Sequence, residues 1–292
     1  LSGRALVIAV PLAWLALFFL VPFLVVAKIS LSEAAIARPP YTPLWEWEGL
    51  RVTLFLNFEN YAYLWRDALY LDAYLFSIST AFISAAVALV VGYPMAYFIA
   101  RSPEPRRTLL LMLVILPFWT SFLLRVYAWQ GFLRDTGVVN GLLTGLGIID
   151  EPLRLLQTNF AVYLGIVYTY LPFMILPLYA TLVKLEQDLL EASADLGARP
   201  VATFLTITLP LSVPGMIAGF LLVFIPAIGE FVIPELLGGP DTLMIGRVLW
   251  NEFFGSRDWP VASAVAIVML LVVVVPIVFL RQIQAHAEER VK

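Results

Sequence analysis

Six long apolar stretches constrain this chain more than any other feature of its sequence. A helix needs about 20 apolar residues to cross a bilayer, because each residue advances it by about 1.5 Å and lipid offers the backbone no hydrogen-bond partner. Segments rich in charge, proline and glycine separate the stretches, as is typical of loops. The predicted spans are 6–28, 73–100, 108–133, 160–183, 207–229 and 259–280. We therefore predict an all-α membrane protein with about six transmembrane helices in a single transmembrane domain, residues 1–292.

The composition fits a membrane environment and excludes several other classes of protein. Hydrophobic residues make up 61% of the chain and charged residues 13%, which is outside the usual range for soluble domains. The net charge of −3 gives no basic surface for nucleic acid. The chain has no cysteine and one histidine, His286, so a metal centre or a Ser-His-Asp triad is not expected. We therefore predict no catalytic residues and no metal site on this chain.

Basic residues predict the orientation of the spans, because short loops rich in Lys and Arg stay in the cytoplasm. The hairpin 101–107, RSPEPRR, holds three arginines in seven residues. The same side then receives Arg4, Lys184, Arg199, Arg281, Arg290 and Lys292. We therefore expect both termini in the cytoplasm, with the first span retained because it is too long for the core of a signal peptide. Acidic residues gather in the outer loops, either through ordinary solvation or to attract a cationic solute.

The cytoplasmic segment 184–206, between the fourth and fifth spans, does not have the pattern of a simple loop. Apolar residues recur at helical spacing at Leu185, Leu189, Ala192 and Leu196. The opposite face carries Glu186, Asp188, Glu191 and Asp195. This pattern predicts a short amphipathic helix that Gly197 can end, and a side chain at Gly197 is expected to clash with or strain the turn. The helix either lies on the protein's own bundle or fits a groove in a partner protein.

Part of this segment has the spacing of a known motif. The pattern E-A-A-x-x-x-G-x9-I-x-L-P is met by Glu191, Ala192, Gly197, Ile207, Leu209 and Pro210. The segment thereby resembles the EAA motif of ABC importer permeases, and Ser193 replaces the second alanine without spoiling the expected fit. The resemblance implies a coupling helix that sits in a cleft of an ATP-hydrolysing subunit. Its residues are Glu191, Ala192, Ser193, Asp195, Leu196, Gly197 and Ala198.

Three further strings, 116–129, 225–250 and 257–267, resemble permeases of polyamine importers, and the putrescine-type branch fits best. This resemblance implies a type I ABC importer permease fold in the bacterial cytoplasmic (inner) membrane. The implied partners are a second permease subunit, two ATP-binding subunits, a periplasmic polyamine-binding protein and membrane lipid. No cofactor is expected on this chain. ATP and Mg²⁺ belong to the partner ATPase, because the sequence lacks the GxxxxGK[ST] phosphate loop.

A polyamine path needs acidic groups for the ammonium ends and aromatic faces for cation–π contacts. The candidates are Glu230, Trp119, Tyr168, Tyr170 and Asp241. Packing between helices is the alternative role of the aromatic residues. Glu230 follows an uncharged run, so it either contacts the substrate or a gate, or forms a salt bridge with Arg125 or Arg247. Arg125, about 25 Å along a continuous third helix, has the wrong charge for the substrate. We expect Arg125 and Arg247 to be structural or interface residues.

Other classes of function fit the sequence less well. A secondary transporter driven by an ion gradient needs coupling acids near the membrane midplane, and spans one, two, four and six contain none. A membrane enzyme would need a catalytic constellation, and an inert scaffold would not need an acidic cytoplasmic helix. An ABC permease for another small solute remains the main alternative to polyamine import.

Overall fold

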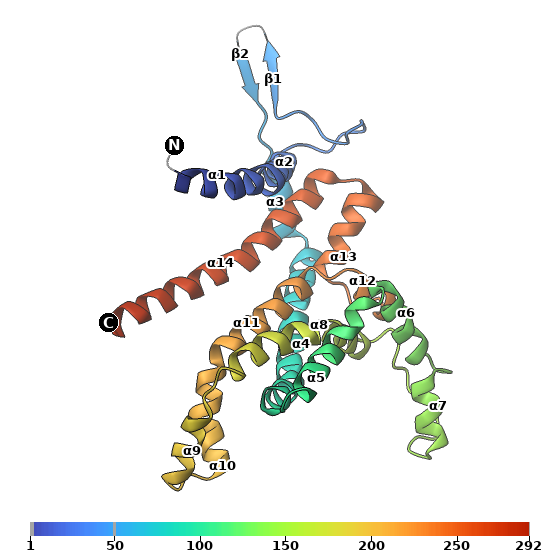
Figure 1. Cartoon of the computed structure of the whole chain (residues 1–292). Helices are drawn as coiled ribbons and strands as arrows, with labels where there is room; N and C mark the ends of the chain where they lie inside the picture. Colours follow the sequence, from blue (N-terminus) through green and yellow to red (C-terminus); the bar gives the residue numbers. More distant parts are fainter. Residues whose placement is uncertain (1–2, 49–50, 292) are drawn as a thin grey trace. The chain divides into compact units, whose positions relative to one another are not determined.

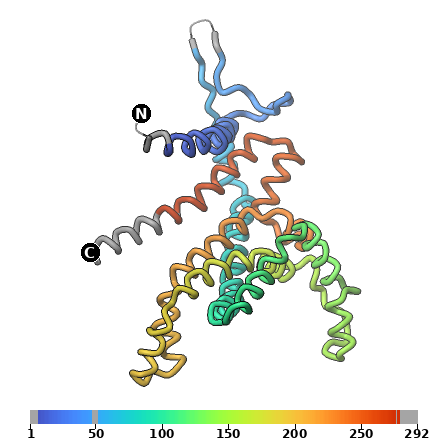
Figure 2. Tube along the Cα trace, in the orientation of Figure 1, coloured from blue at the N-terminus to red at the C-terminus, as the bar shows by residue number. Residues whose placement is uncertain are grey.

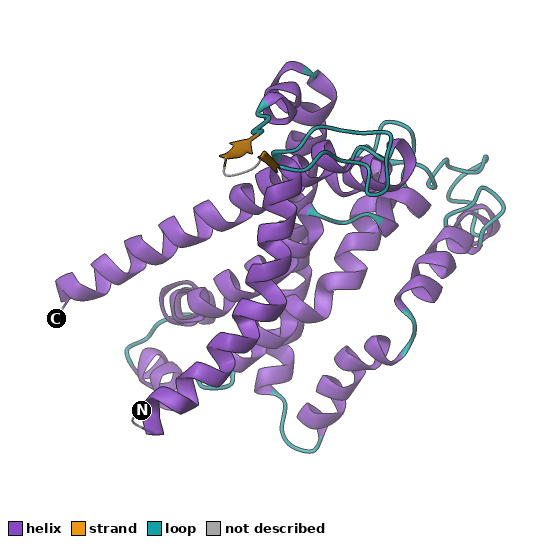
Figure 3. Ribbon diagram, turned by 90° about the horizontal axis from the view of Figure 1, so that it is seen from above, coloured by secondary structure: helices purple, strands orange, loops and turns teal. Residues whose placement is uncertain are grey.

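The computed structural model describes residues 3–48 and 51–291, and most of them are helical (Figure 1). Lys292, expected in the cytoplasm, lies outside the described residues. The chain forms two compact units, unit 1 (Leu1–Tyr74 and Val248–Lys292) and unit 2 (Leu75–Arg247). The strands that the described chain contains form one short hairpin, visible in Figure 3.

The helices begin and end close to the predicted apolar stretches. The N-terminal part contains α1 (Gly3–Leu15), the π-helical turn Ala16–Leu20, α2 (Val21–Ser30), β1 (Trp45–Glu48), β2 (Arg51–Leu54) and α3 (Glu59–Arg66). The middle part contains α4 (Ala68–Arg101), α5 (Arg106–Ile115), the 3-10 turn Leu116–Trp119, α6 (Phe122–Phe132), α7 (Val138–Gly145) and α8 (Asn159–Leu182). The remainder contains α9 (Gln187–Asp195), α10 (Pro200–Thr203), the π-helical turn Phe204–Thr208, α11 (Leu209–Ile228), α12 (Val232–Leu237), α13 (Ile245–Trp250), the π-helical turn Asn251–Ser256 and α14 (Trp259–Val291).

Several of these helices are long and apolar enough to cross a membrane. Among the described residues they are Val7–Ser30, Ala68–Arg101, Asn159–Leu182 and Pro200–Ile228. The bent pair α5 and α6 makes a fifth if it counts as one span, and Trp259–Val275 is a shorter apolar helix. The structure therefore has an apolar helix at each predicted span, whereas the number of spans and the side of the termini stay predictions.

The third predicted span is not a continuous helix. Its two parts, Arg106–Trp119 and Phe122–Phe132, meet at an angle of 90°. Thr120 between them has extended backbone, with φ −99° and ψ 152°, and its Oγ1 donates to the carbonyl of Pro117 at 2.8 Å. Proline lacks an N–H and a threonine hydroxyl that bonds locally competes with the helix ladder, so the helix breaks here. The expectation that Arg125 lies about 25 Å along one straight helix was therefore wrong.

In unit 1, α2 packs against α14. Buried hydrogen bonds connect these two helices to the neighbouring helices α3 and α4. Asn60 on α3 donates from Nδ2 to the carbonyls of Ser30 and Ser32 at 2.9 and 2.8 Å. The hydroxyl of Tyr74 donates to the carbonyl of Val265 at 2.7 Å. The hairpin of β1 and β2 was not predicted, although residues 45–48 and 51–54 alternate in polarity as a strand pair does.

The core of unit 2 lies between α4, α8 and α11. Figure 2 shows the chain running along α8 and returning along α11. Gly215 and Gly219 stand four residues apart on the face of α11 that meets α8. A Cβ at Gly215 would lie 2.6 Å from Thr181 Oγ1, and one at Gly219 would lie 2.8 Å from Met174 Sδ. Small residues at this spacing allow the two helices to approach closely, which is how membrane helices commonly associate.

Candidate coupling surface and transport path

The predicted amphipathic helix is present as α9, and the turn after it is fixed by its backbone. The amide of Gly197 donates to the carbonyl of Ala194 at 2.9 Å, and that of Ala198 donates to Ser193 at 3.1 Å. These two bonds form the Schellman ending of a helix, which requires a left-handed residue. Gly197 supplies it with φ +79°, and no atom lies within 4 Å of a Cβ built there. Strain rather than crowding therefore limits side chains at this position.

The apolar stripe of α9 faces away from the rest of unit 2. Leu189 is exposed and Leu196 is 89% exposed. The buried residue of the helix is Ser193 instead, whose hydroxyl lies 2.8 Å from the hydroxyl of Thr203 on α10. Sequence reasoning treated Ser193 as a tolerated departure from the motif and missed this bond, which alanine could not make. An exposed apolar stripe on a charged helix is typical of a protein-docking surface.

Glu230 lies in a closed environment directly after α11. It is 7% exposed, and its Oε2 accepts a hydrogen bond from the Tyr170 hydroxyl on α8 at 2.5 Å. Its Oε1 accepts from the amides of Val232 and Ile233, at 3.1 and 3.4 Å, where α12 begins. The structure therefore brings two of the predicted path residues, Glu230 and Tyr170, into direct contact.

The two arginines that could have paired with Glu230 are placed differently. Arg247 Nε lies 2.6 Å from Glu235 Oε2, so that charge is paired within α12 and α13. Arg125 Cζ lies 5.7 Å from the ring centre of Phe118 and 6.0 Å from that of Phe122. Among the residues that the structure describes, neither arginine forms a salt bridge with Glu230.

A chain of aromatic rings links these groups between the 3-10 turn Leu116–Trp119, α6 and α8. Phe118, which stacks under Arg125, lies 5.2 Å from the ring of Phe173. Phe173 in turn lies 6.1 Å from the ring of Tyr170, the donor to Glu230. Sequence reasoning did not single out Phe173. Its three-residue spacing from Tyr170 on one helix was the available signal.

The other candidates have separate surroundings. Trp119 is 83% exposed at the end of the 3-10 turn, and Tyr168 packs edge-on against Trp129 with ring centres 5.4 Å apart. Asp241 is exposed in the loop between α12 and α13. It lines a cavity of about 250 Å³ together with Arg154, Gln157, Thr158, Asn159, Gly239, Pro240 and Thr242. The structure thus shows Asp241 beside polar groups rather than within the aromatic chain.

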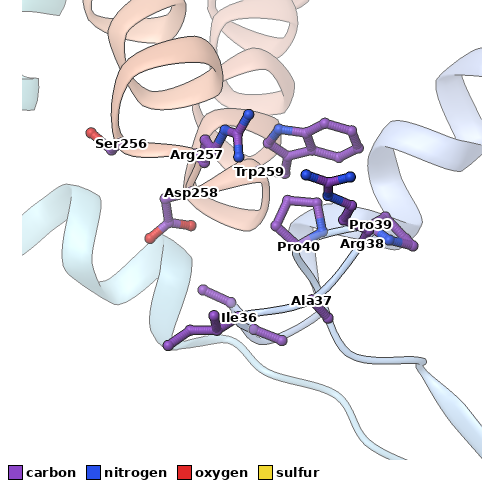
Figure 4. Close-up of a pocket in the computed structure, with 11 residues that line it drawn as sticks. Ile36, Ala37, Arg38, Pro39, Pro40, Ser256, Arg257, Asp258 and Trp259 are labelled. Atoms are coloured by element: carbon purple, nitrogen blue, oxygen red, sulfur yellow. The ribbon is translucent and has the colours of Figure 1, made fainter.

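A larger cavity, of about 760 Å³, lies in unit 1 between the loop 34–40 and residues 256–259 (Figure 4). Arg38, Arg257 and Trp259 contribute to its lining. Asp258 also lines it, and its Oδ1 accepts from the amide of Val261 at the start of α14, 3.0 Å away. Sequence reasoning quoted residues 257–267 as part of a resemblance but did not predict this cavity.

The apolar helices, the tight contact between α8 and α11 and the exposed α9 define a helical membrane protein with an amphipathic helix outside its spans. Residues 88–291 match the family described as binding-protein-dependent transport system inner membrane component. The chain belongs to this family, so it is an inner-membrane permease subunit of an ABC-type transporter and is not itself an enzyme. This match confirms the predicted all-α membrane fold, the resemblance to ABC importer permeases and the inner-membrane location.

Curated relatives cover nearly the whole chain. The spermidine/putrescine transport system permease protein PotB of Escherichia coli (strain K12) is 41% identical over 259 residues, which is 89% of this chain and 90% of the relative. The PotB protein of Haemophilus influenzae is 40% identical over 265 residues, with 90% and 88% covered. The inner membrane ABC transporter permease protein YdcU of Escherichia coli is 32% identical over 250 residues, with 81% and 79% covered.

Solved structures share the fold at low sequence identity. A chain of a bacterial ABC transporter involved in the import of the acidic polysaccharide alginate superposes with a TM-score of 0.66 at 18% identity. The match covers 97% of this chain and 96% of that chain. A second structure shows the alginate transporter in complex with an alginate pentasaccharide-bound periplasmic protein, with a TM-score of 0.65. These likenesses establish the type I ABC importer permease fold.

Proposed function

We propose that this chain is the transmembrane subunit that moves a polyamine, putrescine or spermidine, into the cell by alternating access. The observation that carries the proposal is the 41% identity, over about nine-tenths of both chains, to permeases named for these substrates. The chemistry of unit 2 supports it, because a buried carboxylate stands at the end of a chain of aromatic rings. Ammonium groups are attracted both to carboxylates and to aromatic faces.

In the proposed path, Glu230 receives an ammonium end of the substrate. An ammonium group has three N–H donors, so it can take the place of the Tyr170 hydroxyl at Oε2. The amides of Val232 and Ile233 keep Oε1 in position during this exchange. A carboxylate–ammonium contact in such a partly dehydrated site is worth a few kcal/mol, whereas an exposed pair is worth less than about 1 kcal/mol. Tyr168, Trp119 and Asp241 are the further path residues that we propose.

On the cytoplasmic side, α9 docks in a cleft of an ATP-hydrolysing subunit and transmits its movement. Glu191, Asp195 and Gly197 belong to this surface, with Ala192, Ser193, Leu196 and Ala198. The exposed stripe through Leu196 and the fixed turn at Gly197 support the proposal. Two copies of this ATP-hydrolysing subunit bind ATP and Mg²⁺. A second permease subunit completes the path, and a periplasmic polyamine-binding protein delivers the substrate.

Transport by the reconstituted importer tests the proposal against its main alternative, import of another small solute. Proteoliposomes would hold this chain, its second permease and the ATPase, with ATP inside and the binding protein outside. We expect labelled putrescine or spermidine to accumulate only with ATP and the loaded binding protein. Accumulation of a neutral or anionic solute instead, without competition by either polyamine, would show that the substrate assignment is wrong.

A further inference from the structure

Arg125 carries a charge whose buried nitrogens have no acceptor in the described part of the chain. Its Nε and Nη1 atoms are buried and make no hydrogen bond with any residue that the structure describes. Such groups are rare, because an unpaired charge within an apolar span is costly and buried polar atoms are nearly always paired. The side chain as a whole is only half-buried, so another chain can reach it.

The position of this charge is fixed by the fold. Arg125 lies in the first turn of α6, directly after the 90° break, and the rings of Phe118 and Phe122 lie within 6.0 Å of its Cζ. Contacts with phenylalanine rings replace part of the lost hydration but supply no hydrogen-bond acceptor. The guanidinium is therefore held in place while its Nε and Nη1 find no acceptor among the described residues.

Two carboxylates in the segment that packs against α6 are already engaged. α12 packs against α6, and the carboxylates of Glu230 and Glu235 belong to this segment. Glu230 accepts hydrogen bonds from Tyr170 and from the first amides of α12. Glu235 pairs with Arg247. Among the residues that the structure describes, neither carboxylate forms a salt bridge with Arg125.

We propose that Arg125 forms an ion pair with a carboxylate side chain of the second permease subunit. The inference rests on the proposed function, which supplies that subunit. A carboxylate is the protein group that best fits a guanidinium, whose charge is spread over all three nitrogens. The pair also neutralises the positive charge of Arg125. A series of ring contacts, from Phe118 through Phe173 to Tyr170, leads from this charge to Glu230. A cationic substrate at Glu230 would otherwise be repelled by it.

Co-purification of the two permease chains tests this ion pair. The complete importer is expressed with an affinity tag on the second permease, and both chains are quantified in membranes and in the purified complex. Arg125→Gln should lower the recovery of this chain at least about tenfold, because it leaves the partner's carboxylate buried and unpaired. Its level in membranes should change less than about twofold, and Arg125→Lys should keep most of the assembly because it keeps the charge. Arg134→Gln, which removes an exposed charge in the following loop, should behave like the parent.

A second substitution identifies the partner group. In the Arg125→Gln background, neutralising the right Asp or Glu of the second permease should restore assembly, because the unpaired carboxylate is removed. Normal recovery of Arg125→Gln would overturn the proposal. The proposal would also be overturned if the Arg125→Gln complex loses bound phospholipid and no Asp or Glu neutralisation in the second permease restores assembly. That result would identify a lipid phosphate as the partner of Arg125. If even the parent chain and Arg134→Gln are not recovered with the tagged second permease and the ATPase, the proposed function itself is wrong.

Discussion

At the scale of single residues, Glu230 differs from an ordinary loop carboxylate because each of its oxygens has a protein donor. Oε1 fixes the start of α12 through two amides, and Oε2 meets the Tyr170 hydroxyl. Two backbone amides are a permanent part of the fold, whereas a side-chain hydroxyl can rotate away. The two oxygens can therefore serve different purposes, with Oε1 structural and Oε2 open to exchange with a substrate ammonium group.

Replacing the charge at this position separates these purposes. Glu230→Gln keeps an oxygen for the amides of Val232 and Ile233, so the chain should accumulate normally in membranes. Uptake should fall at least about tenfold, equivalent to about 1.4 kcal/mol, because the ammonium group loses its counter-charge. Initial rates of polyamine uptake at equal protein levels measure the effect.

Glu235→Gln is the matched control for that substitution. It also removes a carboxylate from this segment, but one that is partly exposed and paired with Arg247, so uptake should change little. Equal uptake by Glu230→Gln and the parent would contradict the proposed role of Glu230. Failure of Glu230→Gln to accumulate would show instead that the charge is needed for folding.

At the scale of elements, α9 is defined as much by its ending as by its amphipathic pattern. The Schellman bonds at Gly197 and Ala198 set the direction in which the chain leaves the helix, and the bond between Ser193 and Thr203 ties α9 to α10. The apolar stripe is left exposed, with Leu196 at its end. The orientation of the docking surface therefore depends on a few local contacts.

Substitutions at Gly197 measure how much the turn matters to docking. Gly197→Ala must adopt a left-handed conformation that costs about 1–2 kcal/mol, whereas Gly197→Asn tolerates it better. Uptake and retention of the ATPase should therefore fall least in Gly197→Asn and further in Gly197→Ala. They should be lowest in Gly197→Asp, because it also adds a charge. Membrane levels of this chain should stay unchanged, since no atom lies within 4 Å of the added Cβ. Parent-like ATPase retention by all three variants would remove the support for docking at this turn.

The elements also show which parts of the fold could be predicted from the sequence. Long apolar stretches predict helices because a membrane leaves few alternatives, and the spacing of Leu185, Leu189 and Leu196 predicted α9. The angle of the break at Thr120 could not be predicted. Pro117 marks a weak point in the helix, but tertiary packing sets the bend. A pattern of apolar lengths therefore predicts where helices lie but not how they are interrupted.

The sequence predicted which residues belong to the site but not which of them contact one another. Glu230 and Tyr170 were singled out separately by charge and by aromatic character, yet they are 60 residues apart and their contact follows from the packing of α8 on α11. The environment of Arg125 likewise depends on the bend. The hydroxyl partner of Ser193 lies on the next helix, so no spacing within α9 could indicate it. Long-range contacts of this kind are absent from one-dimensional patterns.

At the scale of the whole molecule, the basic residues of the loops set which side of the membrane each loop faces. The basic hairpin between α4 and α5 carries the strongest signal. Arg106 lies over the ring of Phe98 at 4.8 Å, and Arg107 lies 3.6 Å from Glu104. Glu104 offsets part of the positive charge, but the pair is partly exposed and weak, so the hairpin still resists translocation.

We therefore predict that the hairpin 101–107 is cytoplasmic and that the loop after α7 faces outward. Because the chain has no cysteine, Glu104→Cys and Asp150→Cys each create a unique and exposed thiol. An impermeant maleimide added to spheroplasts should label residue 150 directly and residue 104 only after the membrane is permeabilised. Labelling after denaturation confirms that both thiols are present and reactive. Glu104→Cys also removes the acidic residue of the hairpin, which strengthens its basic signal for retention in the cytoplasm. Labelling of residue 104 from outside in intact spheroplasts would therefore overturn the predicted topology and, with it, the cytoplasmic placement of α9.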